Sequence, residues 1–266
     1  MVIEFLNREL PLYGIFFWLG ILLAGAIAIF IAKKNKIESF DILISGIYTM
    51  FCAIVGSKIL YFIVSWSDIM RFIKVAPEHG YTTLDIISTL MQGGFVFYGG
   101  FIGGVLGLFL YTKIFKKSFS DFAGVYAVVL PFGHSLGRVG CFFGGCCYGI
   151  EYDGPFSHVY KALAHTDAPI GVPLFPVQLL EALCLFILFI ALLIIFLKSD
   201  NRNSLCICTY ALSYAVIRFS LEFLRGDVER GGVGPVSTSQ IISILIFIAS
   251  IAILIFNIKH KQKDNV

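Results

Sequence analysis

Seven long apolar stretches constrain this chain more than any other feature of its sequence. They lie at residues 12–32, 42–65, 94–112, 122–141, 177–197, 205–224 and 237–258. Each is long enough, or nearly so, to cross a hydrocarbon core about 30 Å thick as a helix. The sequence therefore predicts an all-α, polytopic integral membrane protein with seven transmembrane helices. No internal repeat is visible, so residues 1–266 are expected to form a single domain.

The composition excludes a soluble globular enzyme. Hydrophobic residues make up 58% of the 266 residues and charged residues only 14%, whereas soluble domains have about 45–50% and about 25%. No basic block typical of nucleic-acid binding is present, although Lys259, Lys261 and Lys263 could meet anionic lipid. The expected partner is therefore the lipid bilayer and not a nucleic acid.

The distribution of lysine and arginine predicts the orientation. In a seven-helix topology, 11 of the 20 basic residues fall on one side of the membrane and 6 on the other. Because cytoplasmic loops are enriched in these residues, we expect the N-terminus outside and the C-terminus in the cytoplasm. The first apolar stretch lacks a small-residue cleavage site and is expected to be a retained helix. The long connections at 66–93, 142–176 and 225–236 then lie outside, which favours chemistry on the outer face.

Polar residues recur at helical spacing inside several spans. They are His134, Arg138 and Cys141 in the fourth span, Gln178 and Glu181 in the fifth, and Tyr214, Arg218, Glu222 and Arg225 in the sixth. An arginine at the centre of a span costs about 2.5–3.5 kcal/mol on insertion scales. One interpretation is an internal ion-pair network that joins Arg218 to Glu222 and Arg138 to Glu181. The other is an anion site in which each arginine binds a phosphate or carboxylate through two N–H groups at once.

Two glycine clusters accompany these charges. The first crowds the third span and includes Gly99 and Gly100, and the second includes Gly140 and Gly149 near the end of the fourth span. Close helix packing through small residues is one explanation. For the second cluster, the interleaved Arg138 and cysteines favour a broken helix end whose backbone N–H groups could meet a phosphate.

The segment GRVGCFFGGCCYG at 137–149 resembles the signature of the prolipoprotein diacylglyceryl transferases. Further matches follow in order: LPLYGIF at 10–16, GSK with Tyr61, QGGFVFYGGFIGG at 92–104, FPVQLLEAL at 175–183, SYAVIRFSLEFLRGD at 213–227, and Gln240 at the last span. The family transfers a diacylglyceryl group from phosphatidylglycerol to the lipobox cysteine of a prolipoprotein signal peptide. A thioether forms and glycerol phosphate leaves, at the outer side of the bacterial cytoplasmic membrane.

The resemblance implies roles for individual residues. Arg138 and Arg218 are expected to hold the donor phosphate, Glu222 to orient Arg218, and Tyr214 to line the headgroup pocket. Tyr13 matches the family's first-span tyrosine. The remaining candidate binding residues are Gly99, Gly100, Gly140, Cys141, Gly149, Gln178, Glu181 and Arg225. We expect no cofactor.

This chain departs from the family pattern at three positions. Tyr98 stands where members usually have histidine, Cys141 replaces the signature asparagine, and Cys146 replaces the acidic residue. A tyrosine has an ordinary pKa near 10 and is a poor base at neutral pH. His134, one turn before Arg138, is the nearest substitute, and a structural role for it is the alternative.

Cys141, Cys146 and Cys147 admit several roles. At an outward helix end they could form a disulfide, with Cys141 joined to one of the adjacent pair, or pack as small apolar side chains. A reactive thiol or redox role is a second interpretation, and metal binding, which His158 and His165 could join, is a third. For the whole protein, the alternatives are a divergent homologue with another acceptor and a non-catalytic protein that binds or transports phospholipid.

Overall fold

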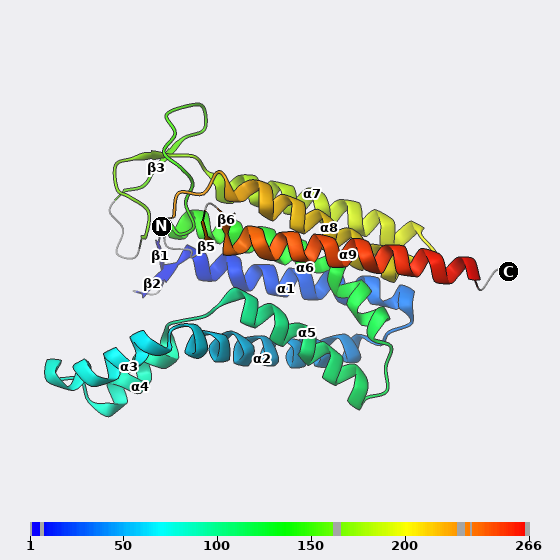
Figure 1. Ribbon diagram of the computed structural model, residues 1–266, viewed down its shortest axis with the longest axis horizontal. Coiled ribbons are helices and arrows are strands. Elements are labelled where there is room, and N and C mark those ends of the chain that lie inside the picture. The colour runs from blue at the N-terminus through cyan, green and yellow to red at the C-terminus, as the bar shows by residue number, and fades with distance from the viewer. Residues whose placement is uncertain (1, 6–7, 162–165, 228–231, 235, 264–266) are drawn as a thin grey trace. The chain divides into compact units, whose positions relative to one another are not determined.

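The computed structural model describes residues 2–5, 8–161, 166–227, 232–234 and 236–263 (Figure 1). Its helices are α1 (Leu12–Ala32), α2 (Ser39–Val64), α3 (Trp66–Val75), α4 (Thr83–Gln92), α5 (Phe97–Ile114), α6 (Phe119–Gly144), α7 (Val177–Lys198), α8 (Arg202–Glu222) and α9 (Thr238–Lys263). Two 3₁₀ turns lie at Lys33–Asn35 and Ala76–His79. Three short antiparallel pairs are β1 (Val2–Phe5) with β2 (Arg8–Pro11), β3 (His158–Val159) with β4 (Pro173–Leu174), and β5 (Gly232–Val233) with β6 (Val236–Ser237).

The prediction of seven membrane-length helices is confirmed for the described residues. The spans are Leu12–Asn35, Ser39–Val64, Phe97–Ile114, Phe119–Gly144, Val177–Lys198, Arg202–Glu222 and Thr238–Ile255. The third span begins at Phe97 and not at Gly94, because Gly94 adopts a left-handed φ of 70° that a helix cannot contain. The fold is all-α, as expected.

The connection at 66–93 differs from the sequence-based expectation of a plain loop, because it contains α3 and α4. Thr82 and Asp85 form a capping box at the start of α4, in which the Asp85 N–H donates to Thr82 Oγ1 at 3.3 Å and the Thr82 N–H donates to Asp85 Oδ2 at 2.9 Å. This spacing of threonine and a carboxylate is a helix-start signal that was present in the sequence.

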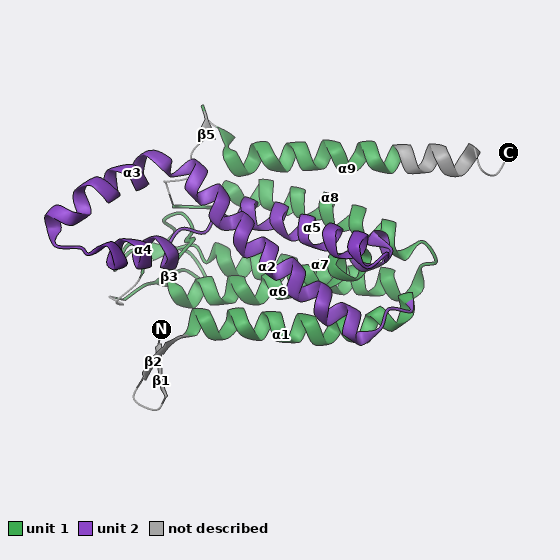
Figure 2. Cartoon of the chain, turned by 90° about the horizontal axis from the view of Figure 1, so that it is seen from below, with its two compact units in different colours: residues 1–35, 123–266 green, residues 36–122 purple. Residues whose placement is uncertain are grey.

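The chain divides into two compact units (Figure 2). The first unit contains Met1–Asn35 and Ala123–Val266, and the second contains Lys36–Phe122. The single domain expected for residues 1–266 stays a prediction. In the second unit α2 packs on α5 through glycines, since a Cβ at Gly99 or Gly103 would clash with the carbonyl oxygens of Gly56 and Cys52. The packing interpretation of this glycine cluster is therefore supported at Gly99 and Gly103.

The first unit is a bundle of α1, α6, α7, α8 and α9 (Figure 1). Gly20 of α1 lies against Gly133 of α6, where an added Cβ would come within 3.0 Å of the Gly133 carbonyl oxygen. Aromatic packing joins α6 to α7, with the rings of Phe132 and Phe189 5.0 Å apart. The helices are held by close backbone approach and ring contacts, which suit a bundle that lipid surrounds.

One end of this bundle is basic. Arg202 Nη1 donates to the Lys34 carbonyl oxygen at 3.2 Å, and Lys34 Nζ donates to the Leu197 carbonyl oxygen. Asn35 and Asn203 are joined by a hydrogen bond of 2.8 Å. The end of α1 and the turn from α7 to α8 therefore meet at this end of the bundle and bring Lys34 and Arg202 together.

At the opposite end, the segment 148–152 lies between two other segments and hydrogen-bonds to both. On one side the Ile150 N–H donates to the Leu224 carbonyl oxygen at 3.0 Å and the Gly226 N–H donates to the Tyr148 carbonyl oxygen at 3.0 Å. On the other side the Phe175 N–H donates to the Ile150 carbonyl oxygen at 3.0 Å. This three-segment brace ties the ends of α6 and α8 to the start of α7.

Candidate functional site

The end of α6 is a Schellman motif. The Cys146 N–H donates to the Cys141 carbonyl oxygen at 3.2 Å, and the Gly145 N–H donates to the Phe142 carbonyl oxygen at 3.3 Å. Gly145 has a φ of 69°, the left-handed conformation that this motif requires. Because the motif brings its first and sixth residues together, Cys141 and Cys146 become neighbours although four residues separate them.

Three side chains fasten this helix end to the bundle. Tyr160 donates from its hydroxyl to the Phe142 carbonyl oxygen at 3.1 Å, Gln178 Nε2 donates to the Cys146 carbonyl oxygen at 2.9 Å, and Thr166 Oγ1 donates to the Gly145 carbonyl oxygen at 3.3 Å. Burial raises the pKa of Tyr160 to about 12, so its hydroxyl stays protonated and able to donate. The backbone after α6 is thus fixed through its carbonyl groups, a common need at helix ends.

Arg138 and Glu181 form a buried ion pair between α6 and α7. Arg138 Nε lies 3.0 Å from Glu181 Oε1, and the two side chains are 13% and 1% exposed. His134, one turn earlier on α6, places Nε2 3.9 Å from the same Glu181 oxygen. The ring of His134 also packs against Tyr214 of α8, with centroids 5.6 Å apart. His134 of α6 therefore lies near Glu181 of α7 and Tyr214 of α8, and it connects polar stripes of three helices.

Arg218 is held by α8 and α9. Its Nη2 lies 2.7 Å from Glu222 Oε2 and donates to Ser239 Oγ at 3.0 Å. The Nη1 atom is buried and has no hydrogen-bond partner among the described residues. Glu222 and Ser239 therefore both contact Nη2, whereas Nη1 is left for another partner, and the orienting role of Glu222 stays a prediction.

Arg225 is fixed where the brace meets the end of α8. Its Nε and Nη2 donate to the two carboxylate oxygens of Asp227 at 3.1 and 2.9 Å. A backbone bridge pairs Arg225 with Gly149, where a Cβ would clash with the carbonyl oxygens of Phe175 and Leu224. Gly149 is therefore required for close backbone approach, and no side chain larger than hydrogen fits there.

Each of these arginines has one carboxylate partner, so the three pairs are together electrically neutral. The ion pairs Arg138–Glu181 and Arg218–Glu222 of the first interpretation are both present. Each pair leaves N–H donors of its arginine available for another acceptor, because a guanidinium has five N–H donors and the carboxylate contacts only one edge. The same arrangement can therefore orient the other edge toward an anion.

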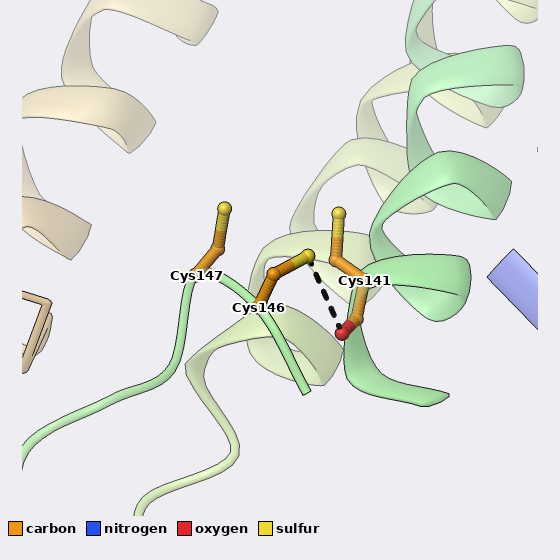
Figure 3. A group of neighbouring side chains, drawn as sticks. All are labelled: Cys141, Cys146 and Cys147. Carbon is orange, nitrogen blue, oxygen red and sulfur yellow. Dashed lines mark hydrogen bonds between the residues drawn. The ribbon is translucent and has the colours of Figure 1, made fainter. Parts of the chain in front are cut away.

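The three cysteines near Arg138 form one cluster (Figure 3). The Sγ atoms of Cys141, Cys146 and Cys147 all lie within 4.8 Å of one another. All seven cysteines of the chain are in its described part and are free thiols, so a disulfide here stays a prediction. Hydrogen bonds with Cys141 and Cys146 lower the pKa of the Cys147 thiol, and Arg138 and Arg225 act in the same direction. Hydrogen bonding with Cys141 and Cys147 raises the pKa of the Cys146 thiol.

The remaining predicted site residues fall in two places. Tyr13 and Gly140 are neighbours, since a Cβ on Gly140 would lie 3.1 Å from the Tyr13 carbonyl oxygen. Tyr98, Gly99 and Gly100 belong to the second unit, which is described by itself, so their place in the site stays a prediction. The ring of His158 packs against Phe142 and Tyr160, with centroids 4.7 and 4.6 Å away.

Histidine ligands for a metal are not found beside the cysteines in the described part of the chain. The group that could hold an ion there consists of the three cysteines alone. His165 lies outside the described residues.

Sequence reasoning missed several residues that shape the site. Ser239 binds Arg218, Asp227 binds Arg225, and Tyr160 and Thr166 hold the end of α6. Asp227 had a signal, because it follows Arg225 by two residues just beyond a helix. Ser239, Tyr160 and Thr166 had none, since only tertiary folding brings them to their partners.

The fold is that of a multi-pass membrane protein, because seven of its described helices are long enough to cross a membrane. Its polar site is a buried cluster of arginine–carboxylate pairs at one end of the bundle. A family model described as prolipoprotein diacylglyceryl transferase matches residues 1–256, and the chain belongs to this family.

Similar proteins support this membership across nearly the whole chain. A phosphatidylglycerol–prolipoprotein diacylglyceryl transferase 2 from Clostridium perfringens is 33% identical over 96% of this chain and 93% of its own. A phosphatidylglycerol–prolipoprotein diacylglyceryl transferase from Clostridium tetani is 32% identical over 99% of both chains. One from Clostridioides difficile is 29% identical over 96% of this chain and 93% of its own.

Proposed function

We propose that this protein transfers a diacylglyceryl group from phosphatidylglycerol to the lipobox cysteine thiol of a prolipoprotein. Its relatives carry the name of this activity over nearly their full length. The observation that carries the proposal to individual residues is the pair of buried arginines, Arg138 and Arg218, each oriented by a carboxylate on one edge. The donor phosphate would occupy the remaining edges.

The polar atoms left over in the site suit the donor headgroup. Arg218 Nη1 is a buried donor and Gln178 Oε1 a buried acceptor, and neither has a hydrogen-bond partner among the residues described. Phosphatidylglycerol offers phosphate oxygens as acceptors and glycerol hydroxyls as donors. Because buried polar groups are rarely left unpaired, both atoms favour a ligand of this chemistry. Tyr214, Arg225 and Gly140 complete the proposed binding surface.

The proposed reaction forms one bond and breaks one. The acceptor thiolate attacks the glyceryl carbon that carries the phosphate, the C–O bond breaks, and glycerol phosphate leaves with the bonding electrons. Negative charge grows on the departing phosphate, which the guanidinium edges of Arg138 and Arg218 would stabilise. A thiol must first lose its proton to become nucleophilic. We propose His134, placed beside Glu181 and Tyr214, as the base, with Tyr98 as the alternative.

The charge distribution supports an outward-facing site in the bacterial cytoplasmic membrane. Lys34 and Arg202 meet at one end of the first unit, and the brace and arginine pairs lie at the other. Because cytoplasmic ends of spans are rich in lysine and arginine, the basic end is proposed to face the cytoplasm and the site to face outward. Phosphatidylglycerol of the outer leaflet and a lipobox cysteine would both reach such a site.

A transfer assay on the purified protein tests this function. The protein in detergent is mixed with phosphatidylglycerol and a synthetic lipobox peptide, and the peptide is analysed by mass spectrometry. We expect a diacylglyceryl mass on the peptide cysteine and none on a peptide with serine there. Arg218→Gln should abolish the adduct, whereas Arg71→Gln, at an exposed arginine of the second unit, should leave it intact.

The negative outcomes separate the alternatives. Donor binding without an adduct, under conditions where a relative forms one, would favour a phospholipid-binding protein. An adduct on a different nucleophile would favour another acceptor. Full activity of Arg218→Gln would contradict the proposed phosphate site.

A further inference from the structure

The proposed transfer assigns no role to the thiols of the sulfur cluster at the end of α6. We propose that Cys141, Cys146 and Cys147 bind a zinc ion whose open fourth position takes the acceptor thiol. This inference rests on the proposed function for the identity of the acceptor, and it replaces the expectation that no cofactor takes part. Metal binding was one of three interpretations that the sequence left open for these cysteines, with His158 and His165 as further ligands, and the site proposed here uses the three cysteines alone.

The geometry of the cluster is close to that of a zinc site. The three Sγ atoms lie within 4.8 Å of one another, and tetrahedral zinc with Zn–S distances of about 2.3 Å needs sulfurs about 3.8 Å apart. Rotation of the side chains can supply the difference of about 1 Å. Figure 3 shows Cys141 and Cys147 pointing their sulfurs in the same direction, with the sulfur of Cys146 between them.

The backbone holds the three cysteines in place before any ion binds. The Schellman motif brings Cys146 beside Cys141, and Cys147 has a φ of 57°, a left-handed conformation that non-glycine residues rarely adopt. Gln178 and Thr166 hold the carbonyl groups of Cys146 and Gly145. A site that is rigid in this way loses little entropy when it binds an ion.

The ligand set favours zinc with one position free. Thiolates select zinc, copper(I) or iron–sulfur clusters among biological metals, and zinc sites that act in catalysis have three protein ligands and an open position. Three cysteines with no fourth described ligand match that pattern. Because zinc does not change its oxidation state, it suits a group transfer in which nothing is oxidised or reduced.

The local charge suits the loaded site. Three thiolates and Zn²⁺ carry a net charge of −1, and a fourth thiolate makes it −2. Arg138 precedes Cys141 by three residues on α6, and the backbone of Arg225 pairs with Gly149, two residues after Cys147. Although each arginine has a carboxylate partner, the guanidinium N–H groups that those carboxylates do not contact could donate to an anionic cluster.

Zinc coordination would activate the acceptor thiol in a chain where Tyr98 stands in place of the usual family histidine. A thiol that binds zinc loses its proton, and the resulting thiolate stays available for attack. The acceptor proton passes to water and on to His134. The bound sulfur then forms a bond with the glyceryl carbon, the C–O bond to phosphate breaks, and glycerol phosphate leaves. The thioether product is a weak ligand and dissociates, which returns the site to its starting state.

The position of the cluster fits the donor site. Cys141 follows Arg138 by three residues on α6, so the two side chains lie on one helical face with Cβ atoms about 5–6 Å apart. An acceptor sulfur held by the cluster would lie beside a phosphate held by Arg138. The arrangement therefore places nucleophile and leaving group next to each other.

Metal analysis of the purified full-length protein tests the site without reference to activity. We expect about one zinc per chain by mass spectrometry of metals, little in Cys141→Ser/Cys147→Ser, and an unchanged content in Cys184→Ala, a cysteine of the first unit outside the cluster. Cobalt(II) exchanged for zinc should give the sulfur-to-metal charge-transfer band. Its visible spectrum should change when the lipobox peptide is added, but not when the serine peptide is added.

Each other outcome overturns a defined part of the proposal. A chain without metal, or with a disulfide at Cys141 in non-reducing mass spectrometry, would overturn the zinc site, and so would copper in place of zinc. A cobalt spectrum that does not change when the cysteine peptide is added would overturn the proposal that the metal binds the acceptor thiol. The wild-type spectra decide these points even if the serine variants fail to fold.

Transfer activity separates this proposal from the one on which it rests. Removal of zinc by a chelator should lower the transfer rate at least tenfold, and added Zn²⁺ should restore it. Transfer at the full rate by metal-free protein would refute the zinc role and leave the proposed function standing. A metal site that responds to the peptide in a protein without transfer activity would refute the proposed function alone.

Discussion

The ion pair between Arg138 and Glu181 allows a decisive test of whether the arginine binds the donor or only balances a carboxylate. The test compares three variants with the wild type: Arg138→Gln, Glu181→Gln and the double variant. The two side chains are 13% and 1% exposed and 3.0 Å apart. Removing one partner of such a buried pair costs about 3–5 kcal/mol of stability, because the other charge is left uncompensated. The double variant replaces the ion pair with two amides and should recover most of that loss.

Activity should not recover in the double variant. If Arg138 gives the donor phosphate two charge-assisted hydrogen bonds of about 1.5–3 kcal/mol each, their loss totals about 3–6 kcal/mol. At 1.4 kcal/mol for each factor of ten, kcat/KM should fall by about 10²–10⁴. This loss should appear in Arg138→Gln and persist in the double variant.

Two measurements separate the effects. Thermal unfolding in detergent reports the stability of each variant, and mass spectrometry of the lipobox peptide gives kcat/KM for phosphatidylglycerol. A double variant that is stable but inactive supports donor binding by Arg138. A double variant within about threefold of wild-type activity would refute the reasoning, because the pair would then be purely structural.

Three further variants test other parts of the site. Gly149→Ala should destabilise the protein by about 1–3 kcal/mol in thermal unfolding, because its Cβ meets the carbonyl oxygens of the brace; Gly137→Ala, where nothing lies within 4 Å, is the matched control and should not. Tyr160→Phe should cost about 1–3 kcal/mol, since the Phe142 carbonyl oxygen loses its donor; an unchanged melting temperature would argue against that hydrogen bond. His134→Gln should lower kcat by about 10²–10⁴ while donor binding stays intact if the histidine is the base; equal loss of rate and binding would indicate a structural histidine.

Much of the architecture was predictable because membrane spans are encoded locally. A run of apolar side chains must form a helix wherever water is absent, so the seven spans follow from the sequence alone. The stripe containing Arg218 and Glu222 was predictable for the same reason, since residues four apart on a helix are neighbours. The helices at 66–92 were missed because α3 and α4 are short and outside the apolar runs.

The contacts between helices were not predictable in the same way. Arg138 and Glu181 were paired as one of two interpretations, and only the packing of α6 on α7 brings Nε to 3.0 Å from the carboxylate. Ser239 reaches Arg218 from α9, a contact with no signal in the local pattern.

The sequence by itself determined the membrane fold, the two arginine stripes and the family resemblance, because each depends on residue type at short spacing. Only the tertiary structure decided that Glu181 faces Arg138, that Arg218 Nη1 stays unpaired, and that three cysteine sulfurs gather within 4.8 Å. The physical reason is that helical periodicity fixes the face of a side chain, whereas packing between helices fixes its partner. The brace of segments at 148–152, 173–175 and 224–226 likewise depends on backbone hydrogen bonds between residues far apart in the chain.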